Sequence, residues 1–130
     1  MKYCLDTSVC VEMMRQGESF DAIDLALPDC RISSITRFEL EYGIHRAPRK
    51  LKSLLGVRLD SLLSNVRSLW FDDAAAAEAA AIRYELEKKG TPIGHYDTLI
   101  AGHARILQLS VVTGNAREFE RVPGLDVISI

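Results

Sequence analysis

Tyr3-Cys4-Leu5-Asp6-Thr7-Ser8, near the amino terminus, joins a short apolar run to residues that favour the start of a helix. The apolar part predicts a buried strand, and Asp6 is a good N-cap for a helix that follows it. A carboxylate directly after a buried strand lies at the carboxyl edge of a sheet, where open α/β folds bind their ligands. This stretch therefore predicts a strand-to-helix turn that also carries chemistry.

The rest of the chain repeats this alternation of strands and helices. Helical spacing of apolar residues, with Gly and Pro as breaks, predicts helices at 35–45, 49–63, 73–89 and 97–109. Short β-branched or apolar runs predict strands at 30–33, 65–71, 110–113 and 127–130. The pattern predicts an α/β fold of three layers, in which helices flank a central parallel sheet of four to five strands.

Length and charge limit the possible function classes. A chain of 130 residues that is 48% hydrophobic suits one domain, residues 1–130, with one core. Its formal charge of −2 does not indicate a nucleic-acid binder, so any phosphate contact must be local. The basic residues Arg46, Arg49, Lys50 and Lys52 are interpreted as a solvated face, although an RNA backbone could use them.

Cysteine usage and hydropathy indicate the compartment. Cys4, Cys10 and Cys30 are odd in number and lack CxxC spacing, which is typical of reduced thiols. There is no signal-like apolar region at the start and no apolar run of about 20 residues. We therefore expect a cytoplasmic protein without a membrane partner.

Four acidic or amide residues occupy junctions between apolar runs and helices: Asp6, Glu39, Asp97 and Asn115. Carboxylates within about 4 Å of each other repel by roughly 4 kcal/mol per pair at an effective dielectric near 20. Mg²⁺ or Mn²⁺ relieves such repulsion and can activate a water for attack on phosphorus. The constellation therefore predicts a hard-metal site for phosphodiester hydrolysis.

The helix at 35–45 carries the least ordinary acid. Ile35, Phe38 and Tyr42 share one face, which we expect to be buried, and Glu39 adjoins it. A glutamate there is rarely just solvated. Glu41 is the competing ligand, but residues two apart diverge by about 200° around a helix, so only one of the two can face the site.

Each candidate also has a purely structural interpretation. Asp6, Asp97, Thr7 and Ser8 are residue types that cap helices, although the Thr7 hydroxyl could also hold a metal-bound water. Asn115 is by default a turn residue after Gly114, and Glu118 a surface acid.

Histidines and aromatic residues are assigned structural roles. His45, His95 and His103 lack metal-pair spacing with one another, which predicts positions at helix ends or on the surface. Trp70 and Phe71 close an apolar strand and are expected in the core.

Four blocks of this chain resemble PIN-domain ribonucleases and, more narrowly, VapC toxins. They are Leu5-Asp6-Thr7-Ser8, residues 32–36 leading into 39–43, Tyr96-Asp97-Thr98-Leu99-Ile100-Ala101, and residues 112–119 with 121–125. The blocks occur in the family's order and cover nearly the whole chain.

The resemblance implies roles for individual residues. Asp6, Glu39 and Asp97 would be the catalytic acids that hold Mg²⁺, for which Mn²⁺ can substitute, and Thr113 would support them. Many PIN domains have an aspartate where this chain has Asn115, so Glu118 is the residue expected to supply charge there.

The resemblance also implies partners. A VapC toxin is a homodimer that cuts structured cellular RNA, commonly tRNA, and is inhibited by a VapB antitoxin. The larger VapBC assembly binds operator DNA through the antitoxin. The helices at 6–16 and 35–63 have more apolar residues than a small sheet needs, so we expect the antitoxin to dock there.

Two other functions compete with a ribonuclease. A non-catalytic PIN-like module that binds RNA or protein would explain the neutral Asn115. A phosphoacceptor receiver domain would also place acids at a sheet edge, but it needs an acid pair after the first strand, where Asp6 stands alone.

Overall fold

The computed structural model describes residues 1–17 and 24–130 and contains one parallel sheet. Its five strands lie in the order β3-β2-β1-β4-β5, and all neighbours are parallel. The strands are β1 (Tyr3–Leu5), β2 (Cys30–Ser33), β3 (Arg67–Leu69), β4 (Ser110–Thr113) and β5 (Val127–Ser129). The predicted α/β class is confirmed, and of the predicted four to five strands the sheet has five.

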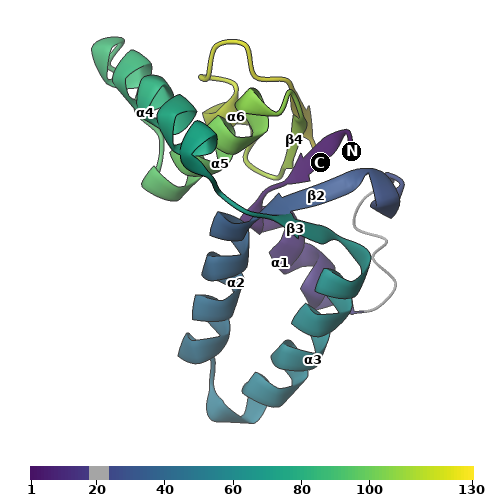
Figure 1. The fold of residues 1–130 in the computed structure, drawn as a ribbon. Coiled ribbons are helices and arrows are strands. Elements are labelled where there is room, and N and C mark those ends of the chain that lie inside the picture. The colour runs from purple at the N-terminus through teal and green to yellow at the C-terminus, as the bar shows by residue number, and fades with distance from the viewer. Residues whose placement is uncertain (18–23) are drawn as a thin grey trace.

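Helices connect the strands and cover the sheet (Figure 1). They are α1 (Thr7–Gln16), α2 (Ser34–Arg46), α3 (Arg49–Asn65), α4 (Asp73–Lys88), α5 (His95–Ile106) and the short α6 (Ala116–Phe119). A 3-10 turn at Leu27–Asp29 precedes β2. Figure 1 shows α2 and α3 extending together below the sheet, with α4, α5 and α6 above it.

The core has two halves, one on each face of the sheet. Leu5 and Val112 face α1 and α3, whereas their neighbours Cys4 and Val111 face α4 and α5. This alternation follows from the two-residue period of a strand. It leaves the central strand β1 and its neighbour β4 buried on both faces, which explains their apolar sequences.

Side-chain caps fix where three helices begin. Asp6 accepts a hydrogen bond from Val9 N, Ser33 from Ile35 N, and Asp72 from Ala75 N. The expected helix at 97–109 instead spans His95–Ile106, and Gln108 just beyond it has a φ of 57°. The third strand is shorter than expected, because α3 continues through Asn65.

Helices α4 and α5 pack with their backbones unusually close. A Cβ added to Gly102 on α5 would lie 2.6 Å from the Cα of Ala79 on α4. Glycine and alanine are the residues that permit such an approach. The alanine-rich sequence of α4 is therefore explained by packing as well as by helix propensity.

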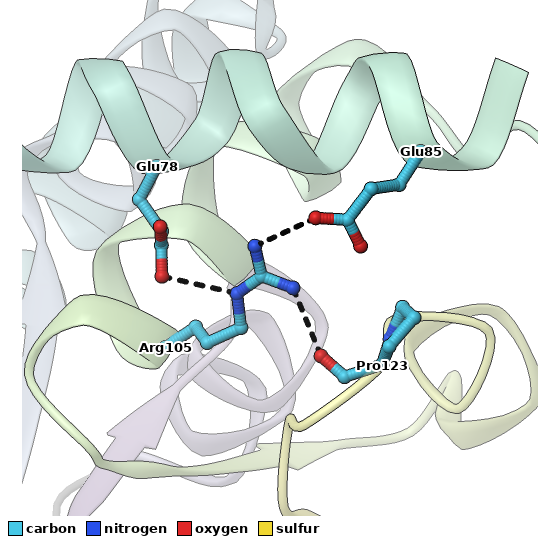
Figure 2. A network of polar contacts seen from close by, with 4 residues as sticks. All are labelled: Glu78, Glu85, Arg105 and Pro123. Carbon is cyan, nitrogen blue, oxygen red and sulfur yellow. Dashed lines mark hydrogen bonds and ion pairs between the residues drawn. The ribbon is translucent and has the colours of Figure 1, made fainter. Parts of the chain in front are cut away.

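An arginine on α5 ties this helix pair to the carboxyl-terminal loop (Figure 2). Arg105 Nε lies 3.1 Å from Glu78 Oε2, its Nη2 lies 3.2 Å from Glu85 Oε1, and its Nη1 donates to the carbonyl of Pro123 at 2.9 Å. Its side chain is only 16% exposed. One guanidinium thus joins α4, α5 and the chain after α6.

The burial of single residues agrees with the sequence expectations at some positions and contradicts them at others. The three cysteines are free and buried, as expected. His103 lies in the last turn of α5, as the helix-end role predicts, but it is buried with its Nδ1 2.9 Å from Ser33 Oγ, so the surface role was wrong. Trp70 is 84% exposed, which contradicts the core role. No helix in the described part of the chain is long and apolar enough to cross a membrane.

Candidate active site

Asp6 is held at the carboxyl end of β1 by two neighbouring elements. Its Oδ1 accepts hydrogen bonds from Ser8 Oγ at 2.6 Å and from Val9 N at 3.0 Å. Its Oδ2 accepts one from Thr113 Oγ1 at 2.5 Å. Asp6 is only 2% exposed and Thr113 is fully buried. The carboxylate is therefore fixed in position by three hydrogen-bond donors.

Glu39 points from α2 toward the start of α1. The Thr7 hydroxyl donates to Glu39 Oε1 at 2.6 Å and lies 3.3 Å from Thr36 Oγ1. Glu41, the competing acid, is exposed and pairs with Arg37 one turn earlier on the same helix, at 3.4 Å. The two acids diverge as helix geometry requires, and Glu39 is the one on the side of Asp6.

Asp97 and Glu118 bring two further carboxylates to the same edge of the sheet. Asp97 lies in the first turn of α5. Glu118, in α6, accepts from Gly94 N at 2.6 Å through Oε1, and from the Asn115 side chain through Oε2. A Cβ built on Gly94 would lie 3.5 Å from Glu118 Oε1 and 3.7 Å from Asp97 Oδ2. Gly94 therefore sits between the two acids.

The electrostatics show that these side chains form one acidic cluster, which comprises Asp6, Glu39, Asp97 and Glu118. Burial, as the largest cause, and then the carboxylates of Glu118, Asp6 and Glu39 together raise the pKa of Asp97 from 3.8 to about 7. None of the ion pairs found among residues 1–17 and 24–130 involves a member of the cluster. The acids thus repel one another, and no ion pair with a described Lys, Arg or His side chain offsets this repulsion.

The donor chemistry of the acidic cluster fits a hard divalent cation, which prefers carboxylate oxygens. However, as these side chains stand, no group of three or more His, Cys, Asp or Glu within the described residues is arranged to hold a metal ion. Glu39 accepts a hydrogen bond from a hydroxyl, and Glu118 accepts hydrogen bonds from two amides.

The structure brings together the acids that the sequence singled out and adds two residues. Ser8, interpreted only as a cap, donates to Asp6 and accepts from Gly114 N at 3.1 Å, so it links α1 to the turn after β4. Gly94 was not singled out, since nothing in a loop sequence indicates that its amide meets an acid 24 residues later. Asn115 is exposed, and its side-chain amide donates a hydrogen bond to Glu118, which is a cluster member.

The face of α2 next to Glu39 is more exposed than the sequence suggested. The stripe of Ile35, Phe38 and Tyr42 was expected to be buried, yet Phe38 is 50% and Tyr42 53% exposed. The buried residues of α2 are Thr36 and Leu40. Helical spacing identified a common face but could not tell which face the sheet covers.

An apolar groove of about 370 Å³ lies on the other side of Glu39, between α1, α2 and α3. Its lining includes Val11, Met14, Leu40, Ile44, Leu51 and Leu54, with Arg15 and Arg58 at its border. Leu51 is 39% and Leu54 46% exposed. The groove thus presents leucine side chains that the protein's own core does not cover.

Comparison with known proteins finds the same fold and similar sequences. The PIN-domain family model matches residues 3–125. The tRNA(fMet)-specific endonuclease VapC of Salmonella typhimurium is 39% identical over 98% of this chain and 96% of its own length. Ribonuclease VapC2 of Rickettsia felis is 34% identical over 96% of this chain and 95% of its own.

Solved structures agree with these relatives. The DNA-bound VapBC structure from Salmonella typhimurium has a chain that superposes with a TM-score of 0.90 at 37% identity, covering 99% of this chain and 98% of that one. A chain of VapBC2 from Rickettsia felis, bound to a DNA fragment from its promoter, gives a TM-score of 0.89 at 33% identity, covering 100% and 99%.

Proposed function

Since this chain belongs to the PIN-domain family and, within it, to the VapC group, we propose that it is a metal-dependent endoribonuclease and the toxin of a toxin-antitoxin pair. It acts as one domain over residues 1–130 and hydrolyses phosphodiester bonds of structured RNA, with tRNA the foremost candidate. The acidic cluster supports this function most, because Asp97 has a pKa raised to about 7 among three other carboxylates.

Asp6, Glu39 and Asp97 are the proposed metal ligands, and Glu118 adds charge beside them. Bound Mg²⁺, or Mn²⁺ in its place, would supply the positive charge that activates a water and stabilises the leaving oxygen. The protein's part is orientation. Thr113 and Ser8 hold the two oxygens of Asp6, and Thr7 holds Glu39.

The fourth position differs from the aspartate common in PIN domains. Asn115 donates its side-chain amide to Glu118, and Gly94 N donates to the other oxygen of the same carboxylate. We propose that Glu118 takes over the negative charge that the neutral Asn115 lacks. Asn115 is then a positioning residue, and Glu118 is the fourth acid of the site.

A VapB-type antitoxin is the proposed partner, because chains with this fold are found in VapBC complexes. The apolar groove between α1, α2 and α3 suits an amphipathic helix from such a partner. Glu39 lines the groove as well as joining the acidic cluster. A segment docked there would therefore reach the site. The proposed assembly is a cytoplasmic homodimer that, with its antitoxin, binds operator DNA.

Purified protein and its variants test this function. With tRNA and Mg²⁺, Asp6→Asn and Asp97→Asn should each abolish cleavage, and EDTA should abolish that of the wild type. Glu41→Gln is the matched control, because Glu41 is an exposed acid on the helix that carries Glu39. Cleavage by both aspartate variants at the wild-type rate would exclude the proposed chemistry.

A second candidate is a non-catalytic PIN-like module that binds RNA or protein. It is favoured by the hydrogen bonds that occupy Asp6, Glu39 and Glu118, and by the neutral Asn115. Calorimetry with Mn²⁺ separates the two functions. A ribonuclease site should bind Mn²⁺ in the wild type but not in Asp6→Asn, whereas the module should bind none.

A further inference from the structure

Three aromatic side chains lie exposed beside the acidic cluster. Phe38 and Tyr42 project from α2 and Tyr96 from α5, and they are 50%, 53% and 47% exposed. The Phe38 and Tyr42 rings are stacked, with an interplanar angle of 5° and centroids 6.1 Å apart. The Phe38 and Tyr96 centroids are 5.6 Å apart. The guanidinium carbon of Arg46 lies 5.7 Å from the Tyr42 centroid. We call these four side chains the aromatic patch.

The aromatic patch begins at the proposed reaction centre and leads away from it. Phe38, Tyr42 and Arg46 follow each other at intervals of four residues, which places them in one row along α2. Phe38 is next to Glu39 in sequence, and Tyr96 is next to Asp97. A hollow of about 460 Å³ is lined by Glu39 together with all four members of the patch.

We propose that the aromatic patch binds unpaired bases of the RNA next to the scissile phosphate, by stacking, while Arg46 contacts a backbone phosphate. This inference rests on the proposed ribonuclease function and names the part of the substrate that the site selects. The sequence predicted that Phe38 and Tyr42 would be buried, and their exposure contradicts that prediction.

Charge explains why stacking would be needed. RNA is a polyanion, whereas this chain has a formal charge of −2 and an acidic cluster where the scissile phosphate must come. Typical nucleic-acid binders gain a large share of their affinity from counterion release by many Lys and Arg side chains, and this chain has no net positive charge to supply it. Stacking on aromatic faces does not depend on net charge and accepts every base. The aromatic patch thus supplies affinity where charge is unfavourable.

The chemistry of the aromatic patch favours bases over an apolar peptide. The leucine-lined groove on the other side of Glu39 offers a peptide an apolar surface, to which the described residues contribute no aromatic side chain. The aromatic patch instead combines flat rings with two phenol hydroxyls and a guanidinium, the groups that stack on splayed bases and contact phosphate in single-stranded RNA. Since only unpaired bases expose their faces, the patch would direct cleavage to loops and ends of structured RNA.

Binding measurements without hydrolysis test the inference. The probe is a short fluorescein-labelled oligouridylate in Ca²⁺, checked for intactness on a gel. Tyr42→Ala should weaken its binding at least tenfold, and Tyr42→Trp should restore it. Tyr84→Ala is the matched control, because Tyr84 is a 67% exposed tyrosine on α4. Arg46→Gln should reduce the slope of log affinity against log salt by about one.

The base itself is tested with a probe in which the nucleotides are abasic. The penalty of Tyr42→Ala should vanish with this probe. Phe38→Leu is a second variant that keeps an apolar side chain, and it should also weaken binding to oligouridylate. The inference would be overturned if Tyr42→Ala bound oligouridylate as well as the wild type, or if the variant lost as much affinity for the abasic probe as for oligouridylate. It would also be overturned if sedimentation showed that Tyr42→Ala loses binding because a homodimer dissociates.

The two proposals fail in different ways. If the wild type cleaves tRNA but Tyr42→Ala binds and cleaves as well as the wild type, the aromatic patch has no such role and the ribonuclease stands. If the wild type binds oligouridylate through Tyr42 but cuts no RNA in Mg²⁺, the patch stands and the ribonuclease fails. The wild type failing to bind the probe at all would also overturn the inference.

Discussion

Replacing Asp97 with asparagine should make the metal-free protein more stable at alkaline pH. The pKa of Asp97 in the folded chain is about 7, above its ordinary value of 3.8, because of burial and then the carboxylates of Glu118, Asp6 and Glu39. The folded state therefore binds the proton more tightly than the unfolded state. Stability is lost as the pH rises from about 4 to about 7, and the loss is complete above pH 7.

The size of the effect follows from the same two values. A change from 3.8 to about 7 corresponds to about 4 kcal/mol for a wholly buried group. Asp97 is only partly buried, and solvent screening reduces the figure to about 2 kcal/mol. Asp97→Asn should therefore raise the melting temperature at pH 8 by about 8 °C, since about 1 kcal/mol shifts it by about 4 °C for a chain of this size.

Thermal unfolding followed by circular dichroism in EDTA at pH 8 and pH 4.5 provides the assay. The gap between Asp97→Asn and the wild type should be small at pH 4.5, where Asp97 is protonated in the folded state. Asp60→Asn, an exposed acid on α3, should change stability by less than about 0.5 kcal/mol at either pH. A variant no more stable than the wild type at pH 8, or an equal gap at both pH values, would refute the reasoning.

Three further predictions concern packing and support of the site. Gly102→Ala should lower the free energy of unfolding in urea by about 3 kcal/mol, because the added methyl group meets the Ala79 backbone. Its control, Gly56→Ala on α3, adds a methyl group that meets nothing and should stabilise the fold by about 0.8 kcal/mol. Equal effects of the two variants would contradict this packing. Arg105→Ala should cost about 3 kcal/mol by leaving two carboxylates unpaired, and a loss below 1 kcal/mol would argue against the network. Thr113→Val should cost about 2 kcal/mol and weaken Mn²⁺ binding in calorimetry; unaltered Mn²⁺ affinity would show that this hydroxyl does not position Asp6.

The sequence predicted the fold well because alternation and caps are local signals. The turn at Asp6, the cap at Asp72 and the glycine after α4 could all be identified from neighbouring residues. Strand order could not, since it depends on which edge each crossover takes. The early start of α5 was missed because Gly94 caps it without a side-chain hydrogen bond.

The acidic cluster was predicted as a set of residues but not as a geometry. Asp6 and Asp97 were singled out from their positions at element ends, and Glu39, inside α2, from the apolar face beside it. The contact of Glu118 with the Gly94 amide, 24 residues away, could not be predicted. The face of α2 was misjudged for a related reason. A stripe of Phe38 and Tyr42 at helical spacing suits a core or a binding surface equally, and only the packed sheet shows which one is present.

The location of a bound ion tests the central claim most directly. Crystals grown with Mn²⁺ at pH 8 and measured by anomalous diffraction should show one strong peak in contact with carboxylate oxygens of Asp6 and Asp97, and that peak should be absent from Asp97→Asn. A protein that is fully folded and saturated with Mn²⁺ but shows no peak at these carboxylates, or binds the ion only elsewhere, would contradict the proposed metal-dependent site.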